Sequence, residues 1–541
     1  MAYAEISRVL GRFFLILTAI LLIPLSVAIT YEFFIEKTIY FSTPATLAFL
    51  ETMGVCLAAA VLFQWLGRKA TGTLYRKESI LVVVLIWFFT AAIGSLPFLF
   101  TNVIKNPVDA YFEATSGLTT TGATIIYPKQ YSNGIEKAVS LRNPLDPSMI
   151  YSFYGTVEPL KDPNTGAILK TGVEALGKPL LFWRNFMQWL GGMGIVVLFI
   201  AVLPALSMGG KFLFENEVPG ISKEGITPRI KETASVLWKI YLGLTLLQIG
   251  LLTLVNSMPL FDAMTIAFST ISTGGFAVNN DGLMTYSRGA FWVIAFFMIA
   301  GSINFTFYFH FLKGKFHRLY EPEFLLYIVL LIFGCLLMAF PLWNTPHIGT
   351  HERYSLSESL VQGSFMAISA QTSTGFANTS YDVWPFACQL LMVLLMYIGG
   401  MSGSTTGGIK VIRYFVIMKM IKHKIESLFR PEVVRALKVG HRPIAPQTSM
   451  TVLIFFCIVI ALVVLGTYLL VFDNQDPFTA FGTISCMINN SGLGLGGIGS
   501  IGSFAFLSTF SKVICIIWMI LGRLEYLSIL VLLVPAFWRN K

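Results

Sequence analysis

The chain has 541 residues, of which 55% are hydrophobic and only 12% charged, and its formal net charge is +10. Soluble domains carry about 25% charged residues, so this composition excludes an ordinary soluble protein and indicates an integral membrane protein. The six cysteines stand singly in apolar stretches, without the paired spacing of metal or redox motifs. We interpret them as small buried hydrophobic side chains.

Long apolar runs divide the chain into ten predicted membrane spans. Their approximate ranges are 13–30, 45–67, 79–101, 180–206, 235–256, 288–312, 324–344, 384–421 (interrupted), 449–472 and 506–537. The first run follows Arg8 and Arg12, as in a signal peptide, but it is longer than a signal's apolar region and lacks a convincing cleavage site. We therefore interpret it as a span and predict an all-α polytopic membrane protein.

Lysine and arginine predict the orientation of these spans. They cluster at 68–77, 211–231, 313–318 and 410–442 and are sparse at the opposite ends of the spans. Because cytoplasmic loops carry the excess of positive charge, both termini are expected inside. The net charge thus favours contact with membrane lipid over nucleic acid. The length of the stretch 410–442 also suits docking of a cytoplasmic partner.

Four short segments, each too short to cross a membrane, precede similar polar triplets and lie between two spans. The segments are 108–118, 260–270, 360–371 and 477–488. The triplets are Thr120-Thr121-Gly122, Ser272-Thr273-Gly274, Ser373-Thr374-Gly375 and Asn490-Ser491-Gly492. A single loop of this kind is usually a plain turn. Four of them around one axis would offer rings of backbone carbonyls that replace the hydration shell of K⁺, so we predict a potassium selectivity filter at these residues.

The residue types suit this role. Glycine permits a turn whose successive carbonyls face one axis, where a β-carbon would obstruct the backbone. The predicted orientation makes all four loops enter from outside. Each short helix then directs its partially negative C-terminal end at the middle of the membrane, which favours a cation. Glu113 and Asp262 lie near the starts of the first two short segments, and we interpret them as caps or anchors rather than ion ligands.

The eighth span is interrupted by a stretch, 399–408, that contains five glycines and four hydroxyl residues. Such a stretch opposes continuous helix, and irregular backbone at membrane depth survives only where it is buried in protein or lines water. We predict that it is a gate beneath the third filter loop, and the alternative is a static kink. The gate residues are Gly403, Ser404, Thr405, Thr406, Gly407 and Gly408.

Arg523 lies deep in the tenth predicted span. A charge at the centre of a spanning helix costs roughly 2.5–3.5 kcal/mol on insertion scales, so it needs a polar environment. We predict that Arg523 projects beneath the filter and forms an electrostatic barrier to the cation. The alternative is that its side chain extends along the helix to the inner interface.

Several segments together resemble the TrkH branch of bacterial potassium uptake proteins. They are YFEATSGLTTTGAT (111–124), WRNFMQWLGGMGI (183–195), TPRI (227–230), GGMSGSTTGGIK (399–410) and GRLE (522–525). The resemblance runs from about Arg8 to Arg539 and implies a homodimer in the bacterial inner membrane, with a gating loop at the interrupted span. It also implies a cytoplasmic regulatory subunit of the TrkA type that binds the nucleotide, while this chain binds no cofactor and K⁺ is its substrate. The loop 132–178 is longer than the family usually has.

The resemblance further implies a pair of additional N-terminal helices followed by four pseudo-symmetric pore units. The ranges are 1–70 for the pair, then 71–210 with a long external loop at about 127–178, 211–320, 321–447 and 448–541. We predict gated K⁺ uptake, and the nearest alternative is a Na⁺-permeable or cation/proton-coupled symporter of the same superfamily. A secondary transporter with two inverted repeats would show two broken helices in matching halves. A membrane enzyme would need convergent carboxylates, a metal cluster or an activated nucleophile, and the sequence shows none of these.

Overall fold

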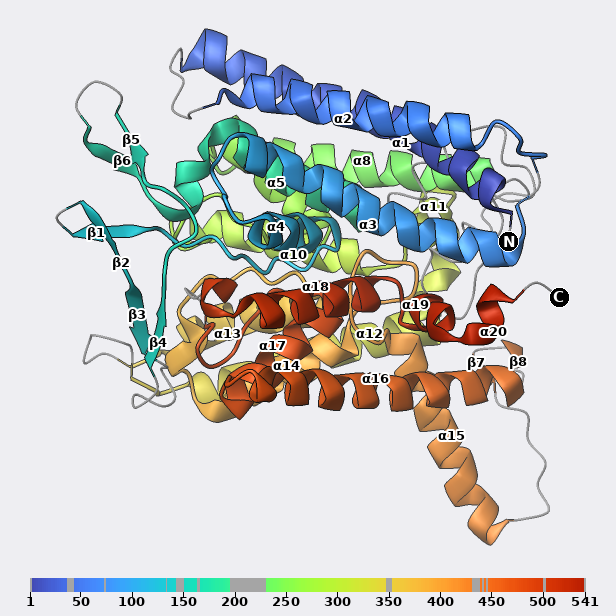
Figure 1. The fold of residues 1–541 in the computed structure, drawn as a ribbon. Coiled ribbons are helices and arrows are strands. Elements are labelled where there is room, and N and C mark those ends of the chain that lie inside the picture. The colour runs from blue at the N-terminus through green and yellow to red at the C-terminus, as the bar shows by residue number, and fades with distance from the viewer. Residues whose placement is uncertain are drawn as a thin grey trace.

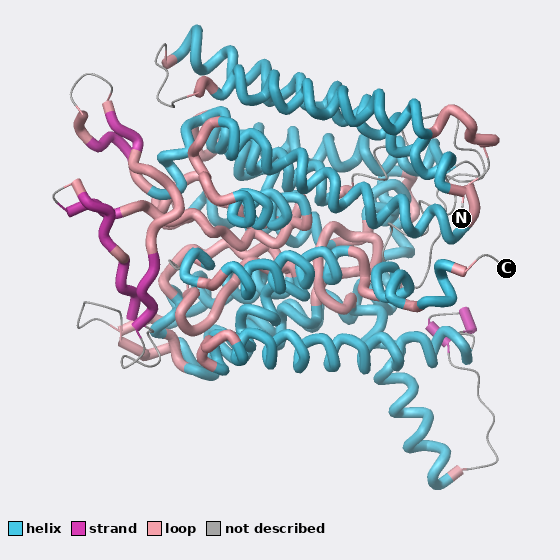
Figure 2. Tube along the Cα trace, viewed as in Figure 1, coloured by secondary structure: helices cyan, strands magenta, loops and turns pink. Residues whose placement is uncertain are grey.

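The computed structural model describes residues 2–36, 43–72, 74–132, 134–142, 150–162, 166–194, 230–346, 353–430, 438–439, 442–443, 446–499 and 503–539. Most of these residues are helical (Figures 1 and 2). The long helices are α1 (Tyr3–Ile29), α2 (Ala45–Leu66), α3 (Arg76–Phe100), α8 (Ile230–Leu254), α12 (Pro322–Leu342) and α16 (Pro446–Phe472). A π-helical turn, Thr30–Ile35, extends α1.

Those six helices, counting α1 with its π-helical turn, are long and apolar enough to cross a membrane, with mean hydropathy from 1.6 to 2.9. Two further candidate spans are bent pairs: α10 (Arg288–Ser302) with α11 (Phe305–Leu312), and α18 (Thr509–Arg523) with the segment from α19 (Leu527–Leu530) to Leu533. The fourth predicted span begins in α5 (Gly177–Gly192), and its part beyond residue 194 lies outside the described residues. The eighth corresponds to α14 (Phe386–Ile398) and α15 (Val411–Phe429). The chain is therefore a multi-pass membrane protein.

The sequence predicted a break in one span, and the structure breaks three of those that follow a predicted filter loop. Besides the stretch between α14 and α15, the chain bends by 96° between α10 and α11 and by 110° after α18. Gly301 and Gly522, near these bends, pack against the carbonyls of Ile271 and Ile488, where a β-carbon would collide. Asn304 then restarts the helix, because its side chain accepts a hydrogen bond from the Thr306 amide at 2.8 Å.

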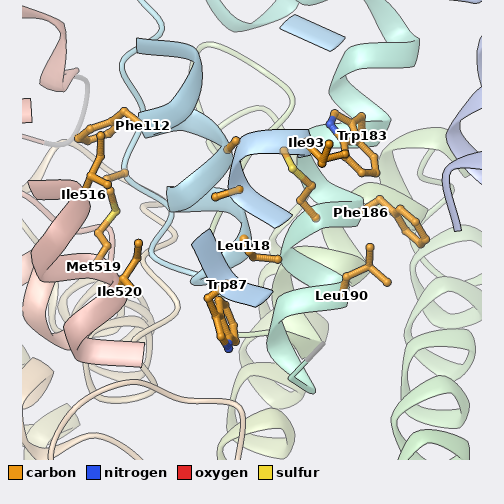
Figure 3. Close-up of a cluster of buried hydrophobic side chains, with 14 of the residues drawn as sticks. Trp87, Ile93, Phe112, Leu118, Trp183, Phe186, Leu190, Ile516, Met519 and Ile520 are labelled. Atoms are coloured by element: carbon orange, nitrogen blue, oxygen red, sulfur yellow. The ribbon is translucent and has the colours of Figure 1, made fainter. Parts of the chain in front are cut away.

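The four short predicted segments are helices that end inside the molecule. They are α4 (Pro107–Leu118), α9 (Leu260–Ile271), α13 (Leu356–Gln371) and α17 (Pro477–Asn489). A capping box, in which Ser355 and Glu358 satisfy each other's backbone amides, starts α13 four residues earlier than predicted. Figure 3 shows how tightly α4 is held: Phe112 faces Ile516 and Met519 of α18, while Leu118 lies between Trp87 of α3 and Leu190 of α5. Close packing of this kind fixes the end of each short helix.

Three small antiparallel hairpins fill the segment between α4 and α5, which was predicted only as an external loop. They pair β1 (Gln130–Ser132) with β2 (Ile135–Lys137), β3 (Val139–Arg142) with β4 (Ile150–Phe153), and β5 (Leu160–Lys161) with β6 (Ile168–Lys170). They gather at one end of the molecule, and both ends of the chain lie at the other (Figures 1 and 2). There the chain also carries the two-residue strands β7 (Lys438–Val439) and β8 (Arg442–Pro443) and the short helix α20 (Pro535–Trp538).

Candidate functional site

The loops that follow the four short helices share one backbone conformation. In each loop a non-glycine residue has a left-handed φ, and the second residue after it is a glycine with φ between +71° and +86°. The non-glycine residues are Thr120, Thr273, Ser373 and Asn490, with φ between +48° and +55°. Such a conformation is costly for a residue with a β-carbon, and it is typical of sites where the surrounding structure imposes a functional geometry.

This shared geometry corrects the register of the second loop. The equivalent triplets are Thr120-Thr121-Gly122, Thr273-Gly274-Gly275, Ser373-Thr374-Gly375 and Asn490-Ser491-Gly492. The same shift appears in the hydrogen bonds, because the Thr121 amide donates to Ser116 and the Gly274 amide to Ser269, each five residues back. The sequence pattern chose Gly274 as the turning glycine, but Gly275 has that role, and Ser272 belongs to the end of α9. Two adjacent glycines made the two registers indistinguishable by sequence.

The four loops close into a ring. A β-carbon on Gly122 would collide with the carbonyl oxygen of Gly274 in the second loop. The other three loops repeat this arrangement. A β-carbon on Gly275 would collide with the carbonyl oxygen of Thr374, one on Gly375 with that of Ser491, and one on Gly492 with that of Thr121. The carbonyl oxygens of four equivalent residues therefore lie against glycines of the adjacent loops, from which no side chain can displace them.

Two cavities lie on opposite sides of this ring. The one on the side of the hairpins has a volume of about 340 Å³ and touches all four turning glycines. The segment after β6 borders it and is held there by Asn280, which accepts from the Val173 amide at 2.8 Å and donates to the Thr171 carbonyl at 3.0 Å. The hairpin β3–β4 is joined to α17, because Tyr151 donates to the carboxylate of Asp476, the N-cap of that helix.

An ion pair buried behind the first two loops was missed by the sequence analysis. The Arg184 Nε atom of α5 donates to the Glu113 carboxylate of α4 at 2.6 Å, and the two side chains are 2% and 0% exposed. Glu113 also accepts from the Ile125 amide at 3.0 Å, while Arg184 donates to the Ala277 carbonyl at 2.9 Å. The pair therefore ties together the segments that leave the first and second loops. Breaking such a pair by removing one partner costs about 3–5 kcal/mol.

Acidic side chains also hold the first turns of two of the short helices. Asp109, in the first turn of α4, pairs with Lys512 of α18 at 2.7 Å. Asp262, in the first turn of α9, lies 3.6 Å from the Lys178 ammonium and accepts from the Tyr286 hydroxyl at 3.1 Å. Asp262 thus has an anchoring contact in the first turn of its helix, as the sequence analysis predicted. Glu113 is also anchored, by Arg184, but it lies in the middle of α4 and not near its start.

The predicted gate lies directly under the ring. Thr405 donates its hydroxyl to the Gly301 carbonyl at 3.0 Å, and the Gly407 amide donates to the Ser373 hydroxyl at 2.6 Å. Gly403 accepts from the Phe305 amide at 3.2 Å, at the break between α10 and α11. Figure 2 shows this stretch as irregular chain between helices. It fills the space between the ring and the second cavity, of about 60 Å³, which has room for only a few water molecules.

Arg523 is directed into the centre of the molecule. Its guanidinium donates to the Thr405 carbonyl at 2.8 Å and to the Thr120 hydroxyl at 3.2 Å. It also donates to the carbonyls of Gly191 at 2.6 Å and Gly192 at 2.7 Å, at the end of α5. These contacts do not fit a side chain extended toward the inner interface. Arg523 links the base of the first loop, the predicted gate and the fourth span.

Two further charged side chains hold the ends of the gate stretch and were not selected from the sequence. Glu323 of α12, only 9% exposed, accepts from the Ser402 amide at 2.7 Å and from its hydroxyl at 3.1 Å. Lys410, 2% exposed, donates to the Thr406 carbonyl and to its hydroxyl, the latter at 2.9 Å. A charge in an otherwise apolar region was the available signal for both, as it was for Arg184.

Comparison with known proteins agrees with this geometry. Residues 160–540 match the family model TrkH, described as a cation transport protein. The chain is 31% identical to the Trk system potassium uptake protein TrkH of Salmonella typhimurium and 30% identical to the Trk system potassium uptake protein TrkI of Halomonas elongata. These alignments cover 100% and 99% of this chain and 100% and 97% of the relatives.

A solved structure shows the same fold. The crystal structure of the potassium transporter TrkH from Vibrio parahaemolyticus matches with a TM-score of 0.79 at 30% identity, and the match covers 100% of both chains. The Salmonella alignment of 546 positions likewise covers both chains completely, so it gives no support to the expected extra length in the loop 132–178. The resemblance seen in the sequence is confirmed. The chain belongs to the TrkH family of cation transport proteins.

Proposed function

We propose that this protein takes up K⁺ through a pore at the centre of the four units. The observation that carries the proposal is the ring of four carbonyls, from Thr121, Gly274, Thr374 and Ser491, held against the glycines of adjacent loops between two cavities. Carbonyl rings of this kind replace the water around a potassium ion. The names of the full-length relatives, which are potassium uptake proteins, support the same substrate and the class of transporter rather than enzyme.

The four short helices support cation selection. Their C-terminal ends lead directly into the ring, so the partially negative ends of four helix dipoles surround the proposed ion site. An anion at the same place would meet the same dipoles and the carbonyl oxygens, both of which repel it. The hairpins and the acidic first turns lie at the outer end, from which the cation would enter.

The stretch between α14 and α15 is proposed as the gate. Arg523 is proposed as its clamp, meaning the side chain that holds the gate closed through its hydrogen bond to the Thr405 carbonyl. Its residues Thr405 and Gly407 hydrogen-bond to groups around the ring, and Arg523 holds Thr405 from the opposite side. A cation cannot pass inward unless this stretch moves. Once it moves, the positive charge of Arg523 remains at the inner end of the filter and slows the ion. The structure thus supports a closed state.

The proposal includes a bacterial inner membrane with both termini in the cytoplasm, a homodimer and a nucleotide-binding partner of the TrkA type. The basic charge near the chain ends supports the orientation. The helix α15 supports a cytoplasmic partner, because it extends away from the other helices at the end where both chain ends lie (Figure 1). Its Ile425 and Phe429 side chains are 55% and 64% exposed, and they line a shallow groove with Lys422.

Reversal potentials of the purified protein in liposomes test the function. Under separate K⁺, Na⁺ and pH gradients, we expect the potential to follow the K⁺ gradient alone. A potential that follows Na⁺ equally would overturn the selective pore, and one that follows pH would show coupling to protons. Gly375→Ala in the same assay should reduce the K⁺ dependence, because the new β-carbon collides with the Ser491 carbonyl.

A further inference from the structure

The second loop of the ring differs from the other three at one position. Gly274 stands where the other loops have the hydroxyl residues Thr121, Thr374 and Ser491. Its φ is not in the left-handed region, so the backbone there does not require glycine. Space does require it, because a β-carbon on Gly274 would lie 2.6 Å from the Cδ atom of Gln188.

Gln188 fills the place of the missing side chain. It projects from α5 and is fully buried. Its Nε2 atom donates to the Gly274 carbonyl at 2.7 Å, and its Oε1 atom accepts from the Phe276 amide at 3.2 Å. The two groups of one amide therefore hold the loop on both sides of Gly275. The carbonyl that Gln188 contacts is one of the four in the ring.

The position of Gln188 can be compared across the four units, because the chain repeats the same packing in each unit. Gly191, Gly301 and Gly522 each pack against the last-turn carbonyl of the short helix before them, from Leu118, Ile271 and Ile488. Three residues before these glycines stand Gln188, Met298 and Met519. In the third unit, Gly399-Gly400-Met401 matches Gly191-Gly192-Met193 of the first unit. The residue of the third unit that is equivalent to Gln188 is therefore Met396, three residues before Gly399.

A second contact between this position and the next loop is found in the third unit. Met396 accepts, through its sulfur, a hydrogen bond from the Ser491 hydroxyl at 2.9 Å, just as Gln188 faces Gly274. Gln188, the one glutamine at this position, therefore contacts Gly274, the one glycine at its position, and Met396 contacts Ser491. The Thr121 and Thr374 hydroxyls instead bond to those of Thr119 and Thr372. In the described part of the chain, we find no side-chain N–H on the equivalent carbonyls of Thr121, Thr374 or Ser491.

We propose that Gln188 is a specificity-determining residue of the pore, which sets the position and the acceptor strength of the Gly274 carbonyl. The proposal rests on the proposed function of the ring as the K⁺ filter. An oxygen that already accepts an N–H attracts a cation less strongly than an unshared one. Among the factors considered for K⁺ over Na⁺ selection is the field strength of the coordinating carbonyls, and a weaker field favours the larger ion, which is easier to dehydrate.

The first test replaces Gln188 by methionine, which keeps the length of the side chain and removes its N–H. We expect the K⁺/Na⁺ permeability ratio from liposome reversal potentials to fall about fivefold, the change that one net hydrogen bond of ~1 kcal/mol allows. Gln188→Asn serves if the methionine variant does not fold, because the shorter amide cannot reach both Gly274 and Phe276. A wild-type ratio in the folded variant overturns the proposal.

The second test separates a role in selection from simple packing. The double variant Gln188→Met/Gly274→Ser reproduces the combination of Met396 with Ser491, but it still has no N–H on the Gly274 carbonyl, so its ratio should stay as low as that of Gln188→Met. Gly274→Ser alone should lower the ratio, since the serine would collide with Gln188. If the double variant recovers the wild-type ratio, Gln188 only fills space and the proposal is wrong.

A matched control and a filter variant complete the experiment. Gln389 of α14 is 2% exposed and donates to the carbonyls of Asp382 and Trp384 at 2.9 and 3.1 Å, away from the ring. Gln389→Met should leave the permeability ratio unchanged. If Gly375→Ala lowers the ratio and Gln188→Met does not, the filter stands and the inference about Gln188 fails. If neither changes it, the filter assignment itself fails.

Discussion

Replacing Arg523 by alanine should release the gate. The guanidinium donates to the Thr405 carbonyl at 2.8 Å, and hydrogen bonds to charged groups contribute about 1.5–3 kcal/mol. Losing that bond would shift the balance between closed and open states about 10- to 150-fold. The charge is lost as well: at about 6 Å and an effective dielectric constant of about 20, it repels a cation by about 3 kcal/mol. Both effects increase basal K⁺ flux.

The assay is Rb⁺ uptake into liposomes, normalised to folded protein. We expect at least tenfold more basal flux for Arg523→Ala and a smaller increase for Arg523→Lys, since lysine keeps the charge but lacks the five donors of arginine. Arg318→Ala is the control, because Arg318 pairs with Glu321 outside the pore. Wild-type flux in a correctly folded Arg523→Ala variant would refute both the clamp and the barrier.

Three other outcomes are expected. Gly375→Ala should raise Na⁺ competition against Rb⁺ uptake, whereas Gly166→Ala, also at a left-handed φ but in open space, should not; equal effects would contradict the ring. Deleting 403–407 should raise basal liposome flux, and unaltered flux in the folded variant would identify the stretch as a static kink. Arg184→Met leaves the Glu113 charge unpaired, so the free energy of unfolding should fall by about 3–5 kcal/mol, and Glu113→Gln added to it should recover part of the loss. Thermal unfolding in detergent measures this, and an unchanged midpoint for Arg184→Met would contradict it.

The elements that repeat along the chain were predictable from sequence. Four short helices, each followed by a polar triplet, stand out because the spacing between spans is regular, and Arg523 stands out because a charge in an apolar run is costly. The register of the second loop was not predictable. Gly274 and Gly275 both satisfy the pattern, and the left-handed φ of Gly275 and the hydrogen bond from the Gly274 amide to Ser269 distinguish them.

The residues that support the site were harder to find, since their partners are distant in sequence. Gln188 contacts a residue 86 positions away and Glu323 one 79 positions away. Nothing local to either position reveals such a contact. Their polarity within apolar segments was visible, but it indicates only that a partner exists and not which one. The hairpins between α4 and α5 were missed for another reason, because strands of two to four residues are too short for alternation to show.

The ring of glycines and carbonyls has a direction. Gly122 abuts the second loop, Gly275 the third, Gly375 the fourth and Gly492 the first, so each loop presses on its successor and is pressed by its predecessor. Bulk added to one loop therefore acts first on the carbonyl of the next loop in this order. Second-site mutations that suppress a filter mutation should accordingly be found in the next unit along the chain. For a mutation in the fourth unit, the suppressors should lie in the first unit. In a ring of four identical subunits any such change would appear in every loop at once, whereas a single chain can adjust each junction separately.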